Sequence, residues 1–485
     1  MAHSIKKRLR GMVAALAAAL VALAIAPTAA LAEPAVMTGG SIHFEDLLAG
    51  DQLTLYKIVD TKVDASTNQI ESDWAGGIDD ATFDMTFEQY EALTSSADKE
   101  AFAEKVGETI TGGSFAVAKT AEVPTGATEV TVDGLTSGQY YVQVANPNDA
   151  SRVYQGIIAS VVPEPQNGEW VLVPGESSYF AKHETVTLDK YFGSNTSNTS
   201  TDEYSVGDDV RFKIRVRTPE YVNPENRTFV ITDTMDEGLE FSRFVSIKAG
   251  NTTLFSSPNV DGTFGPYEYY DIDFTDDGFV ITFKDAFFEE YGGDLLMIEY
   301  TAAVTDDATY QSGITNNAHL KFSTRSYGNE TAERDAAAHV TVYGAQFLKT
   351  TEDEAALPGA AFDVYAKGDK VGEDEPIFTG VTSDENGYII VDGLGVGEFF
   401  LHETKAPAGY QLAADQPFEI TSDVQDGYAG TLQSFVSTPI VDKDVTLPSL
   451  LPSTGDAGTV AFTAVGIGIM AVAAGAIVRA RRNEN

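Results

Sequence analysis

The sequence predicts an all-β protein built from tandem β-sandwich domains in an elongated array. Short runs of alternating apolar and polar residues recur along the chain, and turn signals such as Asp-Gly and Glu-Asn-Gly separate them. These runs include positions 130–132, 139–144, 210–216, 279–283, 295–300 and 388–391. A helical pattern is expected over 86–106. Several short antiparallel strands in each domain are typical of β-sandwiches.

The first 32 residues have the three parts of a secretory signal peptide. A basic cluster comes first, an uncharged apolar run over 11–26 follows, and positions 30–32 have the small-residue pattern that a signal peptidase reads. The basic cluster consists of Lys6, Lys7, Arg8 and Arg10. The alternative is a membrane-spanning anchor, which the small-residue pattern disfavours. We therefore expect a secreted chain whose mature form begins at Glu33.

The length of the mature chain predicts its division into domains. About 420 residues follow the leader before the C-terminal apolar segment, which is typical of about three domains. We expect an N-terminal domain over 33–180, a middle domain over 181–343 and a third domain over 344–447. A linker over 448–458 follows the third domain.

The C-terminus predicts a membrane anchor preceded by a short motif. Positions 459–478 form an uncharged apolar run that is long enough to cross a bilayer as a helix. The tail over 479–485 carries three arginines, and positive charge keeps such an end in the cytoplasm. The motif before the span is Leu451, Pro452, Ser453, Thr454 and Gly455. The chain between the two apolar segments is therefore expected outside the cell.

Composition excludes several classes of function. The formal net charge of −42 argues against nucleic acid as a partner, because phosphate binding needs a basic surface. The six histidines lack metal-ligand spacing, and the acidic pairs lack a calcium-loop pattern, so no metal site is expected. No nucleotide-binding loop or nucleophile elbow is present, so neither a cofactor nor an enzyme is predicted. Because the chain has no cysteine, any covalent staple must be something other than a disulfide.

The motif at 451–455 resembles the LPxTG sorting signal of Gram-positive surface proteins. In that family a sortase cleaves after the threonine and joins its carbonyl to an amine. The resemblance implies that Thr454 becomes linked to another subunit or to peptidoglycan. The order of leader, motif, apolar span and arginine-rich tail makes this resemblance specific, although it covers only the end of the chain.

The third domain resembles the CnaB-type domain of surface adhesins and pilins. The segment 401–410 matches the E-box of Gram-positive pilins (L-x-E-T-x-A-P-x-G-Y), and 347–349 and 357–360 match earlier parts of that domain. The resemblance implies an isopeptide bond between Lys349 and Asp442, promoted by Glu403. Most pilins of this type have asparagine where this chain has Asp442, so a salt bridge without a covalent bond is the alternative.

The middle domain resembles the middle domain of the same pilins, the sortase-assembled major pilins. The matching segments are 188–190, 204–208, 231–233, 238–241 and 316–320. The resemblance implies an isopeptide bond between Lys190 and Asn316, assisted by Asp233. It also implies that the domains are Ig-like or Cna-type sandwiches.

Strand alternation tests these six residues without the family. Successive side chains on a strand point to opposite faces, and each of the six shares its parity with apolar neighbours. Lys190, for example, goes with Leu188 and Phe192. A buried unpaired charge is very costly, whereas an amide between the two groups removes the charges. Burial lowers the pKa of a lysine and raises that of a carboxyl, which favours attack by a neutral amine.

The end of the N-terminal domain has a candidate nucleophile for polymerisation. In pilin families an exposed lysine there attacks the sortase-bound threonine of the next subunit. Lys182 has the corresponding position, after Trp170 and the valines that follow it, but the proline of the pilin motif is missing. The alternative is an ordinary surface lysine. Lys57 also alternates in phase with apolar neighbours, which predicts that it faces the core, and no partner for it is evident from the sequence.

These observations predict a structural subunit of a covalently polymerised, wall-anchored pilus, or fimbria, that supports adhesion. The expected partners are pilin-specific and housekeeping sortases, other pilin subunits, peptidoglycan and a possible host surface ligand. The alternative is a monomeric wall-anchored adhesin or minor pilin. A wall-anchored hydrolase is disfavoured because the sequence has no recognisable catalytic constellation.

Overall fold

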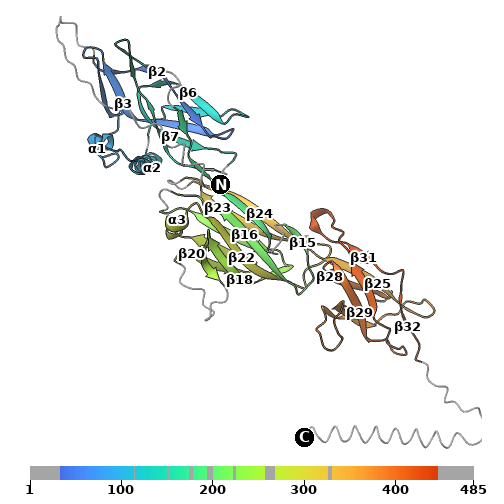
Figure 1. Ribbon diagram of the computed structural model, residues 1–485. Helices are drawn as coiled ribbons and strands as arrows, with labels where there is room; N and C mark the ends of the chain where they lie inside the picture. Colours follow the sequence, from blue (N-terminus) through green and yellow to red (C-terminus); the bar gives the residue numbers. More distant parts are fainter. Residues whose placement is uncertain are drawn as a thin grey trace, which may run out of the picture. The chain divides into compact units, whose positions relative to one another are not determined.

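The computed structural model describes residues 33–113, 115–149, 152–173, 178–193, 200–221, 225–256, 268–325 and 330–445 (Figure 1). The predicted signal peptide, the 451–455 motif, the apolar span and the basic tail lie outside these residues. Within the described ranges, no helix is both long and apolar enough to cross a membrane. The predicted all-β class is confirmed, since strands dominate both compact units of the chain.

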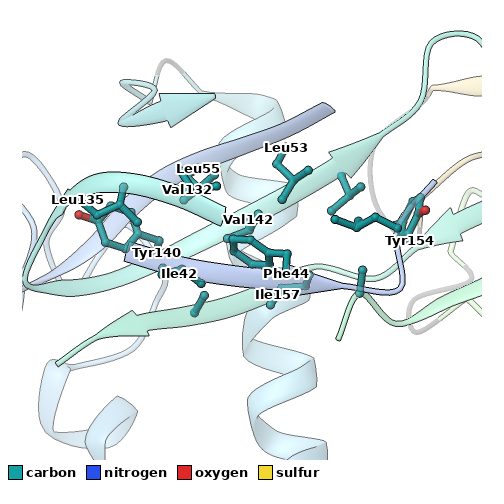
Figure 2. Close-up of a cluster of buried hydrophobic side chains, with 14 of the residues drawn as sticks. Ile42, Phe44, Leu53, Leu55, Val132, Leu135, Tyr140, Val142, Tyr154 and Ile157 are labelled. Atoms are coloured by element: carbon teal, nitrogen blue, oxygen red, sulfur yellow. The ribbon is translucent and has the colours of Figure 1, made fainter. Parts of the chain in front are cut away.

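The first compact unit comprises the described residues up to His183 together with Arg325. One sheet has the order β1-β3-β7-β9, with β4 and β5 also paired to β3, and a second has the order β12-β2-β6. The strands are β1 (Ala35–Val36), β2 (Thr38–Glu45), β3 (Gln52–Asp64), β4 (Gln69–Trp74), β5 (Lys119–Glu122), β6 (Glu129–Thr136), β7 (Gly138–Ala145), β8 (Arg152–Tyr154), β9 (Ile157–Val161), β10 (Glu164–Gln166), β11 (Glu169–Val171) and β12 (Ser178–Phe180). Figure 2 shows the core between the sheets, where Ile42 and Phe44 of β2 meet Leu53 and Leu55 of β3.

Two helices of the first unit replace the single helix that the sequence predicts. Helix α1 (Phe87–Glu91) has a capping box at Thr86, and helix α2 (Ser96–Gly112) begins after Ser95, whose hydroxyl accepts a hydrogen bond from the backbone N–H of Asp98. Because Ser95 caps a new helix, the helical segment is interrupted between α1 and α2. The helices lie beside a second apolar cluster around Trp74.

The second compact unit begins at Glu184 and starts with a sandwich of two sheets. Their strand orders are β14-β16-β22-β18-β19 and β15-β24-β23-β17-β21-β20. The elements from this point are β13 (His183–Thr185), β14 (Thr187–Phe192), β15 (Thr201–Glu203), β16 (Asp209–Arg217), β17 (Phe229–Met235), β18 (Leu239–Ala249), β19 (Thr252–Ser256), β20 (Tyr270–Thr275), β21 (Gly278–Phe283), α3 (Asp285–Tyr291), β22 (Leu295–Val304), β23 (Ile314–Ser323) and β24 (Thr331–Thr341).

A further sandwich follows in the same unit, where β25 begins at Tyr343, two residues after β24 ends. One sheet has the order β28-β25-β31, with β32 also paired to β25, and the other has the order β27-β26-β29-β30. The strands are β25 (Tyr343–Thr351), β26 (Ala361–Ala366), β27 (Phe378–Thr382), β28 (Tyr388–Leu394), β29 (Gly397–Lys405), β30 (Gln416–Ile420), β31 (Leu432–Ser434) and β32 (Ile440–Asp442). The predicted domain boundaries at 180/181 and 343/344 stay predictions.

Candidate functional site

The structure brings Lys190, Asp233 and Asn316 together inside the first sandwich of the second unit. Lys190 belongs to β14 in one sheet, whereas Asp233 and Asn316 belong to β17 and β23 in the other. The Lys190 Nζ lies 2.5 Å from the Asp233 Oδ2 and contacts the Asn316 Oδ1. All three side chains are buried, as strand parity predicts. We call these residues the lysine–asparagine site.

Strand pairing explains why these side chains meet. Strands β17 and β23 run antiparallel, with Asp233 opposite Ala318 and Met235 opposite Asn316. Asp233 and Asn316 are therefore diagonal neighbours on one face of the sheet. The neighbouring strand β21 comes close at Gly278, where a Cβ would lie 2.1 Å from the backbone oxygen of Asp233. A side chain at Gly278 would therefore displace the strand that carries Asp233.

Burial changes the proton affinity of both ionisable groups in this site. Desolvation lowers the pKa of Lys190 to about 8, against the opposing attraction of Asp233. Desolvation also raises the pKa of Asp233, although Lys190 and hydrogen bonds oppose the increase. The two shifts favour a neutral amine beside a protonated carboxyl. In addition, the buried Asp233 Oδ1 has no hydrogen-bond partner within the described part of the chain.

Tyr300 completes the lysine–asparagine site and was not found by sequence reasoning. Its hydroxyl donates a hydrogen bond to the Asp233 Oδ2 at 2.7 Å and accepts one from the Asn316 Nδ2 at 2.9 Å. Tyr300 lies on β22, buried among aromatic rings that include Phe212 and Phe279. The alternation of β22 predicts that its side chain faces the core, but does not distinguish a packing tyrosine from one that bonds a reactive pair.

Lys349, Asp442 and Glu403 meet in the next sandwich. Strands β25 and β32 run parallel, with Lys349 opposite Ile440, and the Lys349 Nζ contacts the Asp442 Oδ1. Glu403 reaches them from β29 in the facing sheet, and its Oε1 lies 3.3 Å from the Lys349 Nζ. All three side chains are buried, again as parity predicts. We call these residues the lysine–aspartate site.

The lysine–aspartate site encloses two carboxyl groups but a single amine. Desolvation raises the pKa of Glu403, and the neighbouring Asp442 raises it further. The backbone N–H of Ala413 donates to the Glu403 Oε2 at 2.6 Å, and this bond opposes the increase. Among the described residues, no N–H or hydroxyl group donates to the buried Asp442 Oδ2. Because two like charges in a dry site repel, this arrangement favours one protonated carboxyl.

Lys182 lies in the first unit, on the surface. Its side chain is 60% exposed and forms an ion pair with Glu100 of helix α2. The backbone on both sides is held, because the Lys182 oxygen accepts from the Gln155 N–H at 3.0 Å and the Ala181 N–H donates to the Glu45 oxygen at 3.0 Å. The segment therefore presents a solvent-accessible amine from an ordered backbone. The pairing with Glu100 was not anticipated from the sequence.

Lys57 has polar partners near the edge of the first unit's core. Its Nζ lies 2.6 Å from the Asp60 Oδ1 and 2.6 Å from the Thr136 Oγ1. Among the described residues no asparagine contacts the Lys57 amine, and we assign it no reactive role. Across the described part of the chain, no group of His, Asp and Glu side chains is arranged to hold a metal ion.

Comparison with family models gives two matches. Residues 344–432 match the prealbumin-like fold domain of the SpaA family. Residues 449–485 match the LPXTG cell wall anchor motif, which confirms the predicted anchor and the cell-wall location.

One curated relative is a streptococcal surface protein. The chain is 26% identical over 319 residues to the trypsin-resistant surface T6 protein of Streptococcus pyogenes serotype M6, covering 60% of this chain and 54% of the relative. The chain thus spans about half the length of this curated relative.

Two solved structures share the fold. The T6 backbone pilin of Streptococcus pyogenes serotype M6 is 18% identical, with a TM-score of 0.62, over 86% of this chain and 100% of that one. The full-length major pilin SpaD of Corynebacterium diphtheriae is 19% identical, with a TM-score of 0.52, over 84% of this chain and 97% of that one. Together with the two family matches, these findings confirm the resemblance that the sequence predicted.

Proposed function

We infer that the chain belongs to the sortase-assembled major pilins and is the structural subunit of a covalently polymerised, wall-anchored pilus, stapled internally by isopeptide bonds. The observation that carries this proposal is the buried contact of Lys190 with both Asp233 and Asn316. A stalk protein without cysteine gains from such a site a cross-link that reducing conditions do not break. The anchor motif at the C-terminus supports attachment of the same chain to the wall.

The lysine–asparagine site has the groups needed for amide exchange. The neutral Nζ of Lys190 adds to the side-chain carbonyl carbon of Asn316, and the carbonyl electrons move to the Oδ1, assisted by protonated Asp233. The bond from that carbon to the Nδ2 then breaks, and the nitrogen leaves as ammonia with one proton derived from the lysine amine. Contact within a rigid core replaces a collision in solution, which raises the effective concentration of the amine.

The lysine–aspartate site supports the corresponding loss of water. The Lys349 amine adds to the carboxyl carbon of Asp442 as Glu403 gives its proton to an Asp442 oxygen, and the resulting hydroxyl leaves as water after gaining a proton from the amine. Glu403 is placed to carry that proton, because its Oε1 lies 3.3 Å from the Lys349 Nζ. A salt bridge in the same contact is the competing outcome, and the intact mass of the chain distinguishes the two.

Both bonds would close long loops of the chain. Lys190 and Asn316 are 126 positions apart, and Lys349 and Asp442 are 93 apart. Closing a loop of this length restricts the unfolded chain. By analogy with a disulfide, each bond should raise the free energy of unfolding by about 5 kcal/mol. Each bond therefore resists unfolding and extension of its domain, as a subunit under tension requires.

Polymerisation would use Lys182 of one subunit and Thr454 of the next. A sortase cleaves the Thr454–Gly455 bond, and the amine of Lys182 then takes the threonine acyl group from the sortase, so that an amide replaces the bond that was cut. The exposed side chain of Lys182 and the held backbone beside it support this assignment. Pilin-specific and housekeeping sortases, other pilins and peptidoglycan are the partners this function requires.

The test is whether the chain enters a covalent ladder in its own cell wall. Wall extracts boiled in denaturant should contain high-mass bands that react with antibody to residues 33–445. A single band at the mass of one anchored chain would overturn the shaft-subunit proposal and favour the monomeric adhesin or minor pilin.

A further inference from the structure

We propose that the hydroxyl of Tyr300 is a catalytic group of the lysine–asparagine site, which carries a proton from Asp233 to the amide nitrogen that leaves Asn316. The proposal rests on the cross-link proposed above and assigns it a further participant. It starts from the position of the hydroxyl, 2.7 Å from the Asp233 Oδ2 and 2.9 Å from the Asn316 Nδ2.

The leaving group explains why such a hydroxyl is needed. An amide nitrogen leaves poorly as an anion, so it must gain a proton as its bond to carbon breaks. The Lys190 Nζ contacts the Asn316 Oδ1, the other polar atom of the amide. Tyr300 is the group that contacts the Nδ2 itself.

The proposed transfer is balanced within the site. Asp233 gives its proton to the Asn316 Oδ1 as the new carbon–nitrogen bond forms, and it then takes a proton from the Lys190 nitrogen. Asp233 then gives a proton to the Tyr300 oxygen while the Tyr300 hydroxyl gives its own to the Asn316 nitrogen, which departs as ammonia. The Asn316 Oδ1 returns its proton to Asp233 as the carbonyl forms again, so Tyr300 ends as a neutral phenol and the products are one amide and one ammonia.

The surroundings of Tyr300 keep its hydroxyl protonated, which is the form that can donate a proton. Desolvation and the nearby Asp233 raise the pKa of Tyr300 well above its ordinary value, so the hydroxyl stays protonated. Rings from two sheets fix its direction, since Phe212 packs against Tyr300 at a centroid distance of 5.6 Å and Phe279 at 5.1 Å. A fixed donor needs no reorganisation when the amide bond breaks.

The lysine–aspartate site provides an internal comparison. The ring over the Lys349 Nζ there belongs to Phe362, which has no hydroxyl. In the described structure the Asp442 Oδ2 has no hydrogen-bond partner. The leaving group at this site is a hydroxyl, and Glu403 is placed to carry the proton with which it departs as water, so no proton has to reach a nitrogen. A tyrosine hydroxyl therefore contacts the site where an amide must leave, and no described tyrosine hydroxyl contacts the site where a carboxyl takes its place.

The experiment follows cross-link formation in chains of residues 33–454 made by cell-free synthesis. Samples are quenched in acid at intervals, and peptide mapping by mass spectrometry measures the linked fraction at both sites. Tyr300→Phe should slow the Lys190–Asn316 link about a hundredfold, which is typical of losing a proton donor. The Lys349–Asp442 link in the same molecules should form at the wild-type rate.

Tyr221→Phe is the matched control in the same sandwich. Tyr221 is also buried, and its hydroxyl donates to the Ser323 backbone oxygen at 2.6 Å, away from the lysine–asparagine site. This variant should form the Lys190–Asn316 link at the wild-type rate. Equal slowing by both substitutions would overturn the specific role of Tyr300, because it would reflect a general loss of packing.

A second variant distinguishes proton transfer by Tyr300 from a role in holding the reacting groups in place. In Asn316→Asp the leaving group is a hydroxyl, which is far less basic than an amide nitrogen and depends less on a proton donor, so adding Tyr300→Phe should slow linking much less than it does with Asn316. Equal losses in both backgrounds would overturn the relay and leave Tyr300 as a packing residue. An unchanged linking rate for Tyr300→Phe alone would also overturn the relay, but it would leave the proposed Lys190–Asn316 cross-link standing. Wild-type chains that never link Lys190 to Asn316 would overturn both proposals.

Discussion

Lys190 and Asp233 meet across a β-sandwich, with the Nζ of one 2.5 Å from the Oδ2 of the other and neither side chain in contact with water. An isolated ion pair at such a depth loses much of its Coulombic gain to desolvation. Condensation of Lys190 with the adjoining Asn316 removes this desolvation cost, because the ammonium charge is lost and a neutral amide remains. The lysine–asparagine site is therefore better suited to reaction than to holding two charges.

The first prediction concerns the mass of the purified chain. Residues 33–454 should weigh less than their sequence dictates by one ammonia and one water, because one amide and one acid condense with lysine. Intact-mass spectrometry of the denatured protein measures this directly. A chain at full mass would contradict both internal bonds, and a deficit of ammonia alone would leave Lys349 and Asp442 as a salt bridge.

The second prediction is that the two bonds form independently. Asp233→Ala should restore the ammonia without restoring the water, and Glu403→Ala should do the reverse, because the sites lie in separate sandwiches. Asp442→Asn should change the second loss from water to ammonia. The same mass measurement checks all three variants. If Glu403→Ala abolished the Lys190–Asn316 bond, the sites would be coupled and the prediction wrong.

Strand alternation accounts for how much of these sites the sequence could predict. Lys190, Asp233 and Asn316 each stand among apolar residues of the same parity, so their burial follows from period two alone. Their pairing came from the family resemblance, because parity does not specify which strands face each other.

Other features could not be predicted by alternation. Tyr300 fits a core position equally well as a packing residue, and only the sheet-to-sheet contact reveals its two hydrogen bonds. The ion pair between Glu100 and Lys182 joins positions 82 apart through the placement of helix α2. The break between α1 and α2, in contrast, had a signal in Ser95 and Asp98, a serine followed three residues later by an acid.

The third prediction concerns pH and uses Asn316→Ala, which cannot form the first bond. Because the folded pKa of Lys190 is lowered to about 8, the unfolded chain binds more protons than the folded one between pH 8 and the ordinary lysine value. The free energy of unfolding of this variant should therefore rise as the pH rises from about 8 to 9.5. Urea unfolding, followed at several pH values, measures it.

The linked wild type is the control for this dependence, since an amide does not titrate. Its stability should be flatter over the same range and, at pH 7, higher by about 5 kcal/mol from loop closure. In the double variant Lys190→Met with Asn316→Ala, the free energy of unfolding should no longer rise between pH 8 and 9.5. A rise that persists without Lys190 would show that another group causes it.

The fourth prediction assigns the intersubunit link to Lys182. Lys182→Ala should abolish the high-mass ladder of wall extracts while leaving single chains attached to the wall, because anchoring uses Thr454 rather than this amine. Lys182→Arg keeps a cation beside Glu100 but supplies no amine that can form the amide, so it should abolish the ladder as well. Lys367→Ala is the matched control, since Lys367 is similarly exposed and paired with Glu398. A ladder that survives both substitutions at 182, or disappears with Lys367→Ala, would contradict the assignment of Lys182.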